Sequence, residues 1–434
     1  MSWGADFVII IGILVALLLG GMWVPFAIGV AGLVSIYLVD GWAGMNALGL
    51  VSWGSVNSFT LTAIPLFILM AEILLQSGVS QRFYQGLIVL VRGLPGGLMQ
   101  TNIAGCALFA AISGSSVATA AAIGTVALPQ LEKRGYDRRM AAGSLAAGGT
   151  LGILIPPSIA MIIYGTFTEV SISKLFMAGF IPGFVLAFLF MLYIAFRAWL
   201  RPEVAPREGG GRISMRERLA AGLELVPFIV LIVSVLGSIY AGIATPTEAA
   251  AVGCSVAVVI SLIWGKFGFA ELNAALTSTV RVSCTIIFIV FNAMIFSYAV
   301  ENAGIGTNLT NWFTGLGLNR YAFFFSLVVM YCILGCLIDS IGMIVLTVPL
   351  LFGSIVGYGF DPVWFGVILV LLLELGMITP PFGINLFVIQ SISKWPLGDV
   401  VRGSAPYWAI ILLYVAFLTA FPDFVTWLPA KLAG

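Results

Sequence analysis

The sequence predicts an all-α polytopic membrane protein made of two inverted-topology repeats. First, 61% of the 434 residues are hydrophobic and only 9% are charged, whereas a soluble chain carries roughly 25% charged residues. Second, apolar runs such as residues 7–39 are long and continuous, unlike the short alternating segments of a β-barrel. Third, an apolar segment broken by two adjacent prolines occurs twice. Lipid must therefore cover most of the surface.

Composition also excludes several functions. A net charge of +1 gives no basic surface for nucleic acid, and the absence of histidine removes His-based metal sites and proton relays. No Walker-type motif, nucleophile–base pair or metal cluster is present, so we expect neither ATP hydrolysis nor an enzyme. The N-terminus lacks the basic region of a cleaved signal. The five cysteines lie in apolar segments and are expected to pack as small hydrophobic residues: Cys106, Cys254, Cys284, Cys332 and Cys336.

Ten apolar runs are expected to cross the membrane, since each approaches the length of about 20 residues that a span needs. The first two share the hinge Gly20-Gly21. The runs are 7–20, 22–39, 59–77, 139–165, 175–197, 222–243, 248–265, 280–303, 363–392 and 405–422.

Two further segments are predicted to be re-entrant hairpins. In 98–131, two short apolar arms flank the polar sequence Ser113-Gly114-Ser115-Ser116. Such a tip is tolerated within a membrane only against protein or a water-filled cavity. The second hairpin, 321–356, has longer arms and a tip near Asp339-Ser340.

The distribution of Lys and Arg predicts the orientation. With the arginine-rich loop 197–218 in the cytoplasm, 16 of the 19 basic residues fall on that side and only Lys174, Arg320 and Lys431 fall outside. This asymmetry agrees with the excess of Lys and Arg in cytoplasmic loops. Both termini then face outside, the first hairpin enters from the cytoplasm and the second enters from the outside.

The two halves repeat each other. Each contains five crossings and one hairpin, and an odd number of crossings makes the second half start on the opposite side, as in many secondary transporters. We therefore divide the chain into a first repeat 1–197 (scaffold helices, hairpin 98–131, broken helix 139–165), a basic cytoplasmic linker 198–219, and a second repeat 220–434 (hairpin 321–356, broken helix 363–392). The pairs 224 residues apart are Pro156/Pro380, Pro157/Pro381, Gly152/Gly376, Asp137/Asp361, Gly179/Gly403 and Pro182/Pro406, with Gly78/Gly304 and Pro129/Pro349 close to this spacing.

The broken helices are the first candidate binding elements. Two adjacent prolines remove backbone donors and disfavour a continuous helix. At the break, carbonyl oxygens without a helical hydrogen bond can bind Na⁺, and the ends of the half-helices can bind a carboxylate. Thr150, Ser158, Thr379 and Asn385 add polar side chains there. The alternative is that the prolines only kink two packed helices, but their duplication favours a binding site.

The hairpin tips are the second candidates. Hydroxyls at Ser113–Ser116 and Thr119 either bind a cation or simply allow close helix packing. Asp339 is costly inside lipid and so is a functional candidate, the alternative being a carboxylate at the outer surface. For two more acids, Glu72 and Glu374, three interpretations are open: proton carriers, partners of neighbouring groups, or residues that face a cavity. No Lys or Arg lies in the middle of a predicted span, so an anionic substrate would be held by hydroxyls, amides and helix ends. Glu248 instead belongs to a predicted capping box beginning at Thr245.

Five ordered motifs resemble the large membrane subunit of tripartite ATP-independent periplasmic (TRAP) transporters. They are residues 64–72, 113–120, 152–158, 245–253 and 376–385. The resemblance implies Na⁺-driven, elevator-type uptake of an organic acid across a bacterial inner membrane. It also implies a periplasmic binding protein and a small four-helix membrane subunit. We expect the small subunit to be a separate chain, because this sequence starts with its own first helix.

Carried onto this sequence, the resemblance predicts two pseudo-symmetric Na⁺ sites. Na⁺ is the coupling ion and no other cofactor is expected. The small carboxylate substrate is predicted to contact Thr119, Ser158, Ser340 or Asn385. The alternatives are a stand-alone Na⁺/dicarboxylate carrier and a non-transporting membrane scaffold. The first Na⁺ site combines Ser113, Gly114, Ser115, Ser116, Thr150, Gly152 and Pro156, and the second combines Asp339, Gly376, Thr379 and Pro380.

Overall fold

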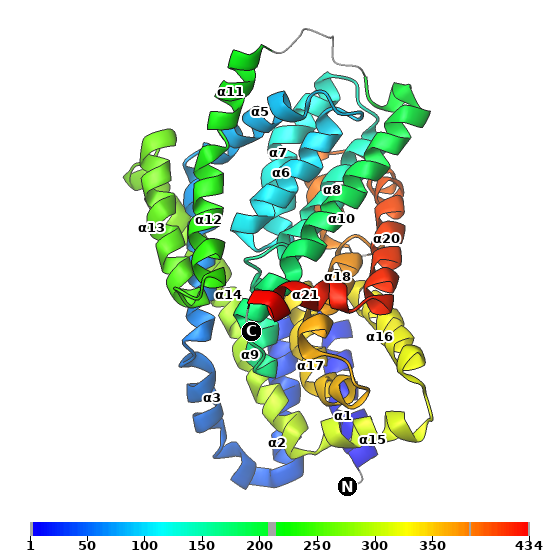
Figure 1. Cartoon of the computed structure of the whole chain (residues 1–434). Helices are drawn as coiled ribbons and strands as arrows, with labels where there is room; N and C mark the ends of the chain where they lie inside the picture. Colours follow the sequence, from blue (N-terminus) through cyan, green and yellow to red (C-terminus); the bar gives the residue numbers. More distant parts are fainter. Residues whose placement is uncertain (1–2, 207–213, 382, 433–434) are drawn as a thin grey trace.

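The computed structural model describes residues 3–206, 214–381 and 383–432, and these residues form helices and turns without a β-strand. Helices are expected in this chain, because a bilayer offers no water to satisfy backbone N–H and C=O groups. Figure 1 shows an elongated bundle whose N-terminus lies at one end.

The first half contains ten α-helices and one short 3-10 helix within its described residues. These are α1 (Trp3–Leu19), α2 (Val24–Met45), α3 (Leu48–Val56), η1 (Thr60–Thr62), α4 (Ala63–Gln76), α5 (Val79–Val91), α6 (Leu98–Ser113), α7 (Ser116–Lys133), α8 (Arg138–Leu154), α9 (Ile159–Thr168) and α10 (Ile172–Leu200).

The second half follows a short connection. Its elements are η2 (Pro202–Val204), α11 (Met215–Leu223), α12 (Val226–Tyr240), α13 (Pro246–Trp264), α14 (Phe269–Asn302), α15 (Ile305–Gly315), α16 (Arg320–Gly335), α17 (Ser340–Gly357), α18 (Pro362–Met377), α19 (Ile384–Ser393), α20 (Leu397–Ala420) and α21 (Asp423–Leu432).

All ten predicted crossings coincide with helices, and both predicted hairpins are helix pairs, α6–α7 and α16–α17. By length and hydropathy, seven helical segments of the described chain are able to cross a membrane, or nine if each of two bent pairs is one span. The ten predicted crossings differ from this set in two ways. They include α1, which has only 17 residues, and the pair α18–α19, whose helices have only 16 and 10 residues. They leave out α17, which was predicted as a hairpin arm but is long and apolar enough to cross a membrane. The short helices α3, α5, α11, α15 and α21 were not predicted, since none of them is a long apolar run.

One predicted boundary is wrong in a way that affects the site. The crossing expected at 280–303 belongs to α14, which begins at Phe269 and has 34 residues. The polar residues of its first three turns, including Glu271 and Ser278, concealed this start in the hydropathy pattern. Arg281 therefore lies about 18 Å along the helix, and not at its end.

Corresponding features recur in the two halves in the same order. An αL glycine starts α5 and α15, and a hairpin with proline in its second arm follows in each half. Asp137 and Asp361 cap α8 and α18, and the Pro156–Pro157 and Pro380–Pro381 bonds that follow these helices are both cis. In Figure 1, α7 lies in the upper half of the view and α17 in the lower half. The inverted membrane orientation of the two halves stays a prediction.

The predicted linker 198–219 falls partly outside the described residues, which resume at Ser214. Its described parts are the end of α10, η2 and the start of α11, whose first turn is closed by a capping box between Ser214 and Glu217.

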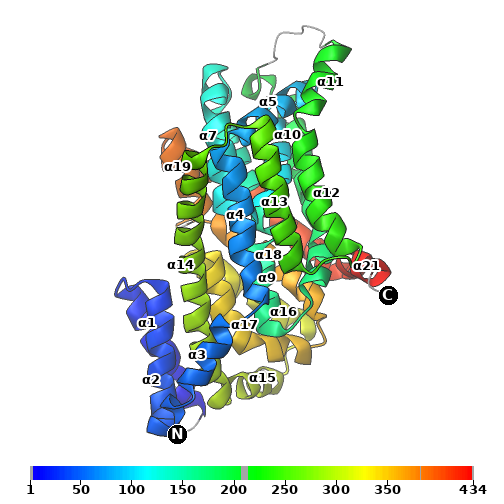
Figure 2. The ribbon, with the colours of Figure 1, turned by 90° about the vertical axis from the view of Figure 1, so that its left-hand side faces the viewer.

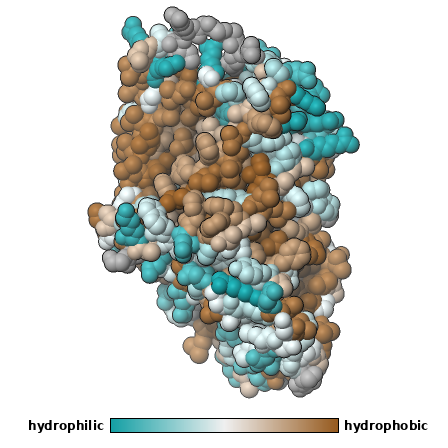
Figure 3. Space-filling view, turned by 45° about the vertical axis from the view of Figure 1, so that its right-hand side comes forward, coloured by the Kyte–Doolittle hydropathy of each residue, from teal (hydrophilic) through white to brown (hydrophobic). Residues whose placement is uncertain are grey.

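One face of the molecule carries a broad hydrophobic surface. Figure 3 shows a broad brown surface between hydrophilic side chains at the top and in the lower part of the view. Large hydrophobic side chains that are exposed on α10 and α20 include Phe188, Leu192, Phe196 and Leu413. This arrangement suits a protein surrounded by lipid.

The long helix α14 packs along α2 and α4, while α4 also packs against α13 (Figure 2). On the other side of the molecule, α8 crosses α20 at Gly143 and Gly403, where a side chain on either glycine would collide with backbone of the other helix. An ion pair between Arg139 Nε and Asp399 Oδ1 at 2.8 Å flanks this crossing. The two halves of the chain are thus joined by close helix contact.

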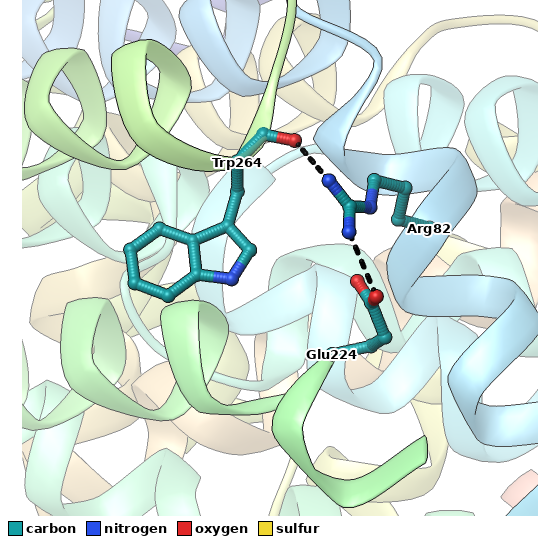
Figure 4. A network of polar contacts seen from close by, with 3 residues as sticks. All are labelled: Arg82, Glu224 and Trp264. Atoms are coloured by element: carbon teal, nitrogen blue, oxygen red, sulfur yellow. Dashed lines mark hydrogen bonds and ion pairs between the residues drawn. The ribbon is translucent and has the colours of Figure 1, made fainter. Parts of the chain in front are cut away.

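Arg82 on α5 links two more helices. Its Nη1 donates to the backbone oxygen of Trp264 at 2.7 Å, and its Nη2 pairs with Glu224 Oε1 at 2.8 Å (Figure 4). The carbonyl belongs to the last turn of α13, where a cation is favourable. Arg82 therefore fixes the helix that leads into the first hairpin.

Replacing Arg82 with alanine is expected to destabilise the chain by about 1 kcal/mol. Most of this loss comes from the hydrogen bond to the Trp264 carbonyl, because the partly exposed ion pair with Glu224 contributes little. Thermal melting in detergent measures this. Glu224→Gln is the matched control, since it removes the ion pair and leaves the bond to Trp264. An Arg82→Ala variant that melts at the wild-type temperature would contradict this role.

Candidate functional site

The tip of the first hairpin is seated on the first helix break. Ser116 Oγ donates to the carbonyl oxygen of Thr150 at 3.3 Å, and the N–H of Ile159 donates to that of Gly114 at 3.4 Å. Gly114 has φ +59°, which ends α6 and turns the chain toward α7. A β-carbon on Gly152 would lie 2.7 Å from both the Ser115 carbonyl carbon and Thr119 Oγ1. The hairpin and the break therefore form one compact unit.

Hydroxyl groups occupy the interior of this unit. Ser113 Oγ and Thr119 Oγ1 lie 2.6 Å apart and share a hydrogen bond. Ser115 caps α7 by accepting from the N–H of Ala118, and Thr150 Oγ1 donates to the Ala147 carbonyl at 2.7 Å. The predicted first-site residues are thus brought together, with Pro156 in the adjoining turn between α8 and α9.

The second hairpin meets the second break in the same way. The backbones of Gly335 and Gly376 approach too closely for a side chain on either residue. Cys336 Sγ lies 3.3 Å from the carbonyl oxygen of Pro380. Asp339 caps α17, since its Oδ2 accepts from the N–H groups of Ile341 at 3.2 Å and Gly342 at 3.5 Å. Thr379 Oγ1 donates to the Leu375 carbonyl at 2.5 Å.

Both hairpin tips line one cavity of about 530 Å³. Ser113–Ser116 reach it from the first hairpin, and Asp339 and Ser340 reach it from the second. Helices α4 and α14 also line it, through Ile68, Ala71, Glu72, Arg281, Val282, Thr285, Ile286 and Ile289. A single space therefore connects the two predicted sites with helices outside the hairpins.

The other predicted residues do not line this cavity. Thr150, Gly152, Gly376 and Thr379 belong to the breaks on which the tips are seated. Of the predicted substrate contacts, only Ser340 faces the cavity. The hydroxyls of Thr119 and Ser158 are fully buried and already bonded, to Ser113 and to the Ile153 carbonyl.

Asn385 also lies away from the cavity. Its side chain is fully buried, its Nδ2 donates to the Ala146 carbonyl of α8 at 3.3 Å, and its Oδ1 has no partner among the described residues. It joins the second half-helix of one repeat to the broken helix of the other. This is a packing position between repeats.

The flagged acids have three different environments. Glu72 lines the cavity and accepts from Ser278 Oγ at 2.7 Å and from Gln76 Nε2 at 3.3 Å. Glu374 is fully buried in α18, and neither carboxyl oxygen has a hydrogen-bond partner in the described chain. Glu248 forms the predicted capping box with Thr245, so that prediction is confirmed.

One cysteine differs from the prediction. Cys284 on α14 is exposed and does not pack as a small hydrophobic residue.

Arg281 and Thr285 are cavity residues that the sequence reasoning missed. They lie one turn apart on α14, and Thr285 Oγ1 donates to the Arg281 carbonyl at 3.0 Å. Because Arg281 lines the cavity, the expectation that only hydroxyls, amides and helix ends would hold an anionic substrate is incomplete. The signal available was the polar series Ser278, Arg281 and Thr285 at helical spacing directly before an apolar run.

Chemically, the cavity offers hard oxygen ligands and one guanidinium. The hydroxyls and carbonyls of the first tip and the carboxylate of Asp339 suit an alkali cation. Arg281 suits an anionic group, and the isoleucine and alanine side chains suit an apolar body.

Comparison with known proteins gives a family for the whole chain. The family model "Tripartite ATP-independent periplasmic transporter, DctM component" matches residues 11–424. A C4-dicarboxylate TRAP transporter large permease protein from Pseudomonas aeruginosa is 34% identical, over 91% of this chain and 92% of that protein. A sialic acid TRAP transporter large permease protein from Vibrio cholerae is 29% identical over 96% and 97%.

Longer relatives and solved structures match as well. An isethionate TRAP transporter permease protein from Oleidesulfovibrio alaskensis is 31% identical over 96% of this chain and 66% of that protein. The YdaH transporter of Alcanivorax borkumensis matches with a TM-score of 0.61 at 16% identity, covering 89% of each chain. The latter likeness shows a shared fold.

Proposed function

Since the chain belongs to the DctM component family of tripartite ATP-independent periplasmic transporters, we propose that it is the Na⁺-coupled permease subunit of an organic-acid importer. The observation that supports Na⁺ coupling best is the common cavity, where the hydroxyl-rich tip Ser113–Ser116 and the carboxylate of Asp339 meet. Small carboxylates are the proposed cargo, in line with the names of the relatives.

The proposed mechanism is an elevator in which the two hairpin–break units move together against a static wall. Contacts between the repeats support a single moving body: Asn385 bonds to α8, and α8 crosses α20. The static wall would comprise α2, α4, α13 and α14, which pack on one another. Movement of the cavity past this wall would expose the substrate to each side of the membrane in turn.

The proposed partners are a periplasmic binding protein that delivers the acid and a separate small membrane subunit. We place the complex in a bacterial inner membrane. The exposed apolar side chains of α3 and α14, such as Leu50 and Val280, offer lipid or the small subunit a surface to cover.

Uptake by the reconstituted complex tests this function. Proteoliposomes holding the chain with its small subunit, supplied with the binding protein and radiolabelled succinate or N-acetylneuraminate, are expected to accumulate an acid only under an inward Na⁺ gradient. Equal uptake in Na⁺-free buffer under a proton gradient would contradict the coupling. Equal uptake by the chain alone, without the binding protein, would favour a stand-alone carrier.

A further inference from the structure

We propose that Arg281 binds a carboxylate of the transported acid at the wall of the cavity formed by α4 and α14. This inference rests on the proposed function, because it needs an anionic cargo. It assigns the recognition of the substrate's charge to a residue outside the hairpins and breaks.

The first support is position. Arg281, Thr285 and Ile289 follow one another at intervals of four residues along α14, so they share one face of the helix, and all three line the cavity. Ser115 and Asp339 line the same cavity. Among the described residues that line this space, Arg281 is the one basic side chain.

The second support is that Arg281 makes no ion pair with a described residue. Arg82, Arg138 and Arg139 each pair with a carboxylate elsewhere in the structure. The neighbouring acid Glu72 instead accepts from Ser278 and Gln76. The Arg281 guanidinium is therefore available to a ligand.

The third support is chemical fit. A guanidinium presents a planar fork of N–H donors that matches both oxygens of a carboxylate. Thr285 lies beside it, and Val282, Ile286 and Ile289 offer apolar contact for the carbon skeleton. If the cation binds near Asp339 of the second hairpin, the substrate carboxylate binds near Arg281. The two charges of a symported pair would thereby be bound by different elements, the second hairpin and α14.

This arrangement also makes recognition depend on the state of the transporter. If the hairpins move and α14 stays packed on α2 and α4, Arg281 meets the substrate only when the hairpin tips face it, as in this structure. Arg281 would then bind the acid at one end of the transport cycle.

The test measures KM for uptake in the reconstituted complex with Arg281→Lys and Arg281→Gln. The probes are succinate, N-acetylneuraminate and 2,3-diketo-L-gulonate, and each probe that the wild type transports is paired with an analogue carrying a carboxamide in place of a carboxylate. We expect Arg281→Gln to raise the KM of the acid about tenfold or more and to abolish discrimination between acid and amide. Arg281→Lys should restore part of the affinity, because it keeps the charge and loses the fork.

Lys266→Gln is the matched control. It removes a positive charge just before α14, at a residue that does not line the cavity, so any effect of charge on membrane orientation should appear in both variants. A KM within twofold of wild type for Arg281→Gln, or an equal change in Lys266→Gln, would overturn the inference. Absence of uptake of all three acids by the wild type would instead count against the proposed function.

Discussion

Gly152→Ala is expected to reduce Na⁺-driven uptake about a hundredfold. A single methyl group on Gly152 would meet the backbone of Ser115 and, at 2.7 Å, the hydroxyl oxygen of Thr119. The backbone has no flexible end that can move aside, so the hairpin tip must shift. A displacement of about 1 Å in a binding group costs on the order of 10²-fold in function. The shift would also separate Ser116 from the Thr150 carbonyl inside a buried polar cluster.

The control for this variant is Gly237→Ala on α12. A β-carbon there would meet only a Val233 methyl at 3.7 Å, an ordinary contact. Both substitutions replace a helical glycine and gain similar helix propensity. The difference in uptake between the two variants therefore measures the effect of the collision between the new methyl group and the hairpin tip. Uptake is measured in proteoliposomes and unfolding by thermal melting. Wild-type uptake and Na⁺ activation in Gly152→Ala would refute the seating of the hairpin tip on the break.

The hairpins and breaks were predictable because their signals are local. Two apolar arms around Ser113–Ser116 define a hairpin from a short stretch of sequence, and α6 and α7 match the predicted arms closely. Adjacent prolines likewise define both breaks. The near-constant spacing paired Asp137 with Asp361, and the structure shows that the two aspartates cap corresponding helices, α8 and α18.

The cavity was less predictable because its walls come from distant segments. Glu72, Ser115, Arg281 and Asp339 are brought together only by tertiary packing. Hydropathy assigned Arg281 to a cytoplasmic loop, since the first turns of α14 carry several polar side chains. For Asn385, the residue type indicated polar chemistry beside the break, but its direction depends on how α19 packs on α8. The sequence pattern alone does not show in which direction the Asn385 side chain points.

Asp339→Asn is expected to remove most of the Na⁺ activation of uptake while leaving the fold intact. The Asp339 carboxylate lines the cavity and caps α17 through two backbone N–H groups. Asparagine caps a helix as well as aspartate does, and its size is the same, so the substitution removes the charge alone. A charge-assisted contact contributes about 1.5–3 kcal/mol, which corresponds to a rise of roughly ten- to a hundredfold in the Na⁺ concentration for half-maximal uptake.

Two further variants separate charge from structure. Asp361→Asn makes the same change at the cap of α18, where Asp361 accepts from the Trp364 N–H at 2.8 Å and does not line the cavity, so its Na⁺ response should stay that of the wild type. Asp339→Ala should lose the Na⁺ response and also about 1 kcal/mol of stability, because it removes the cap. If Asp339→Asn kept the wild-type Na⁺ response, the cation would have to bind elsewhere. The hydroxyl cluster of the first hairpin would then be the remaining predicted site, and Ser115→Ala would be the variant expected to weaken Na⁺ activation.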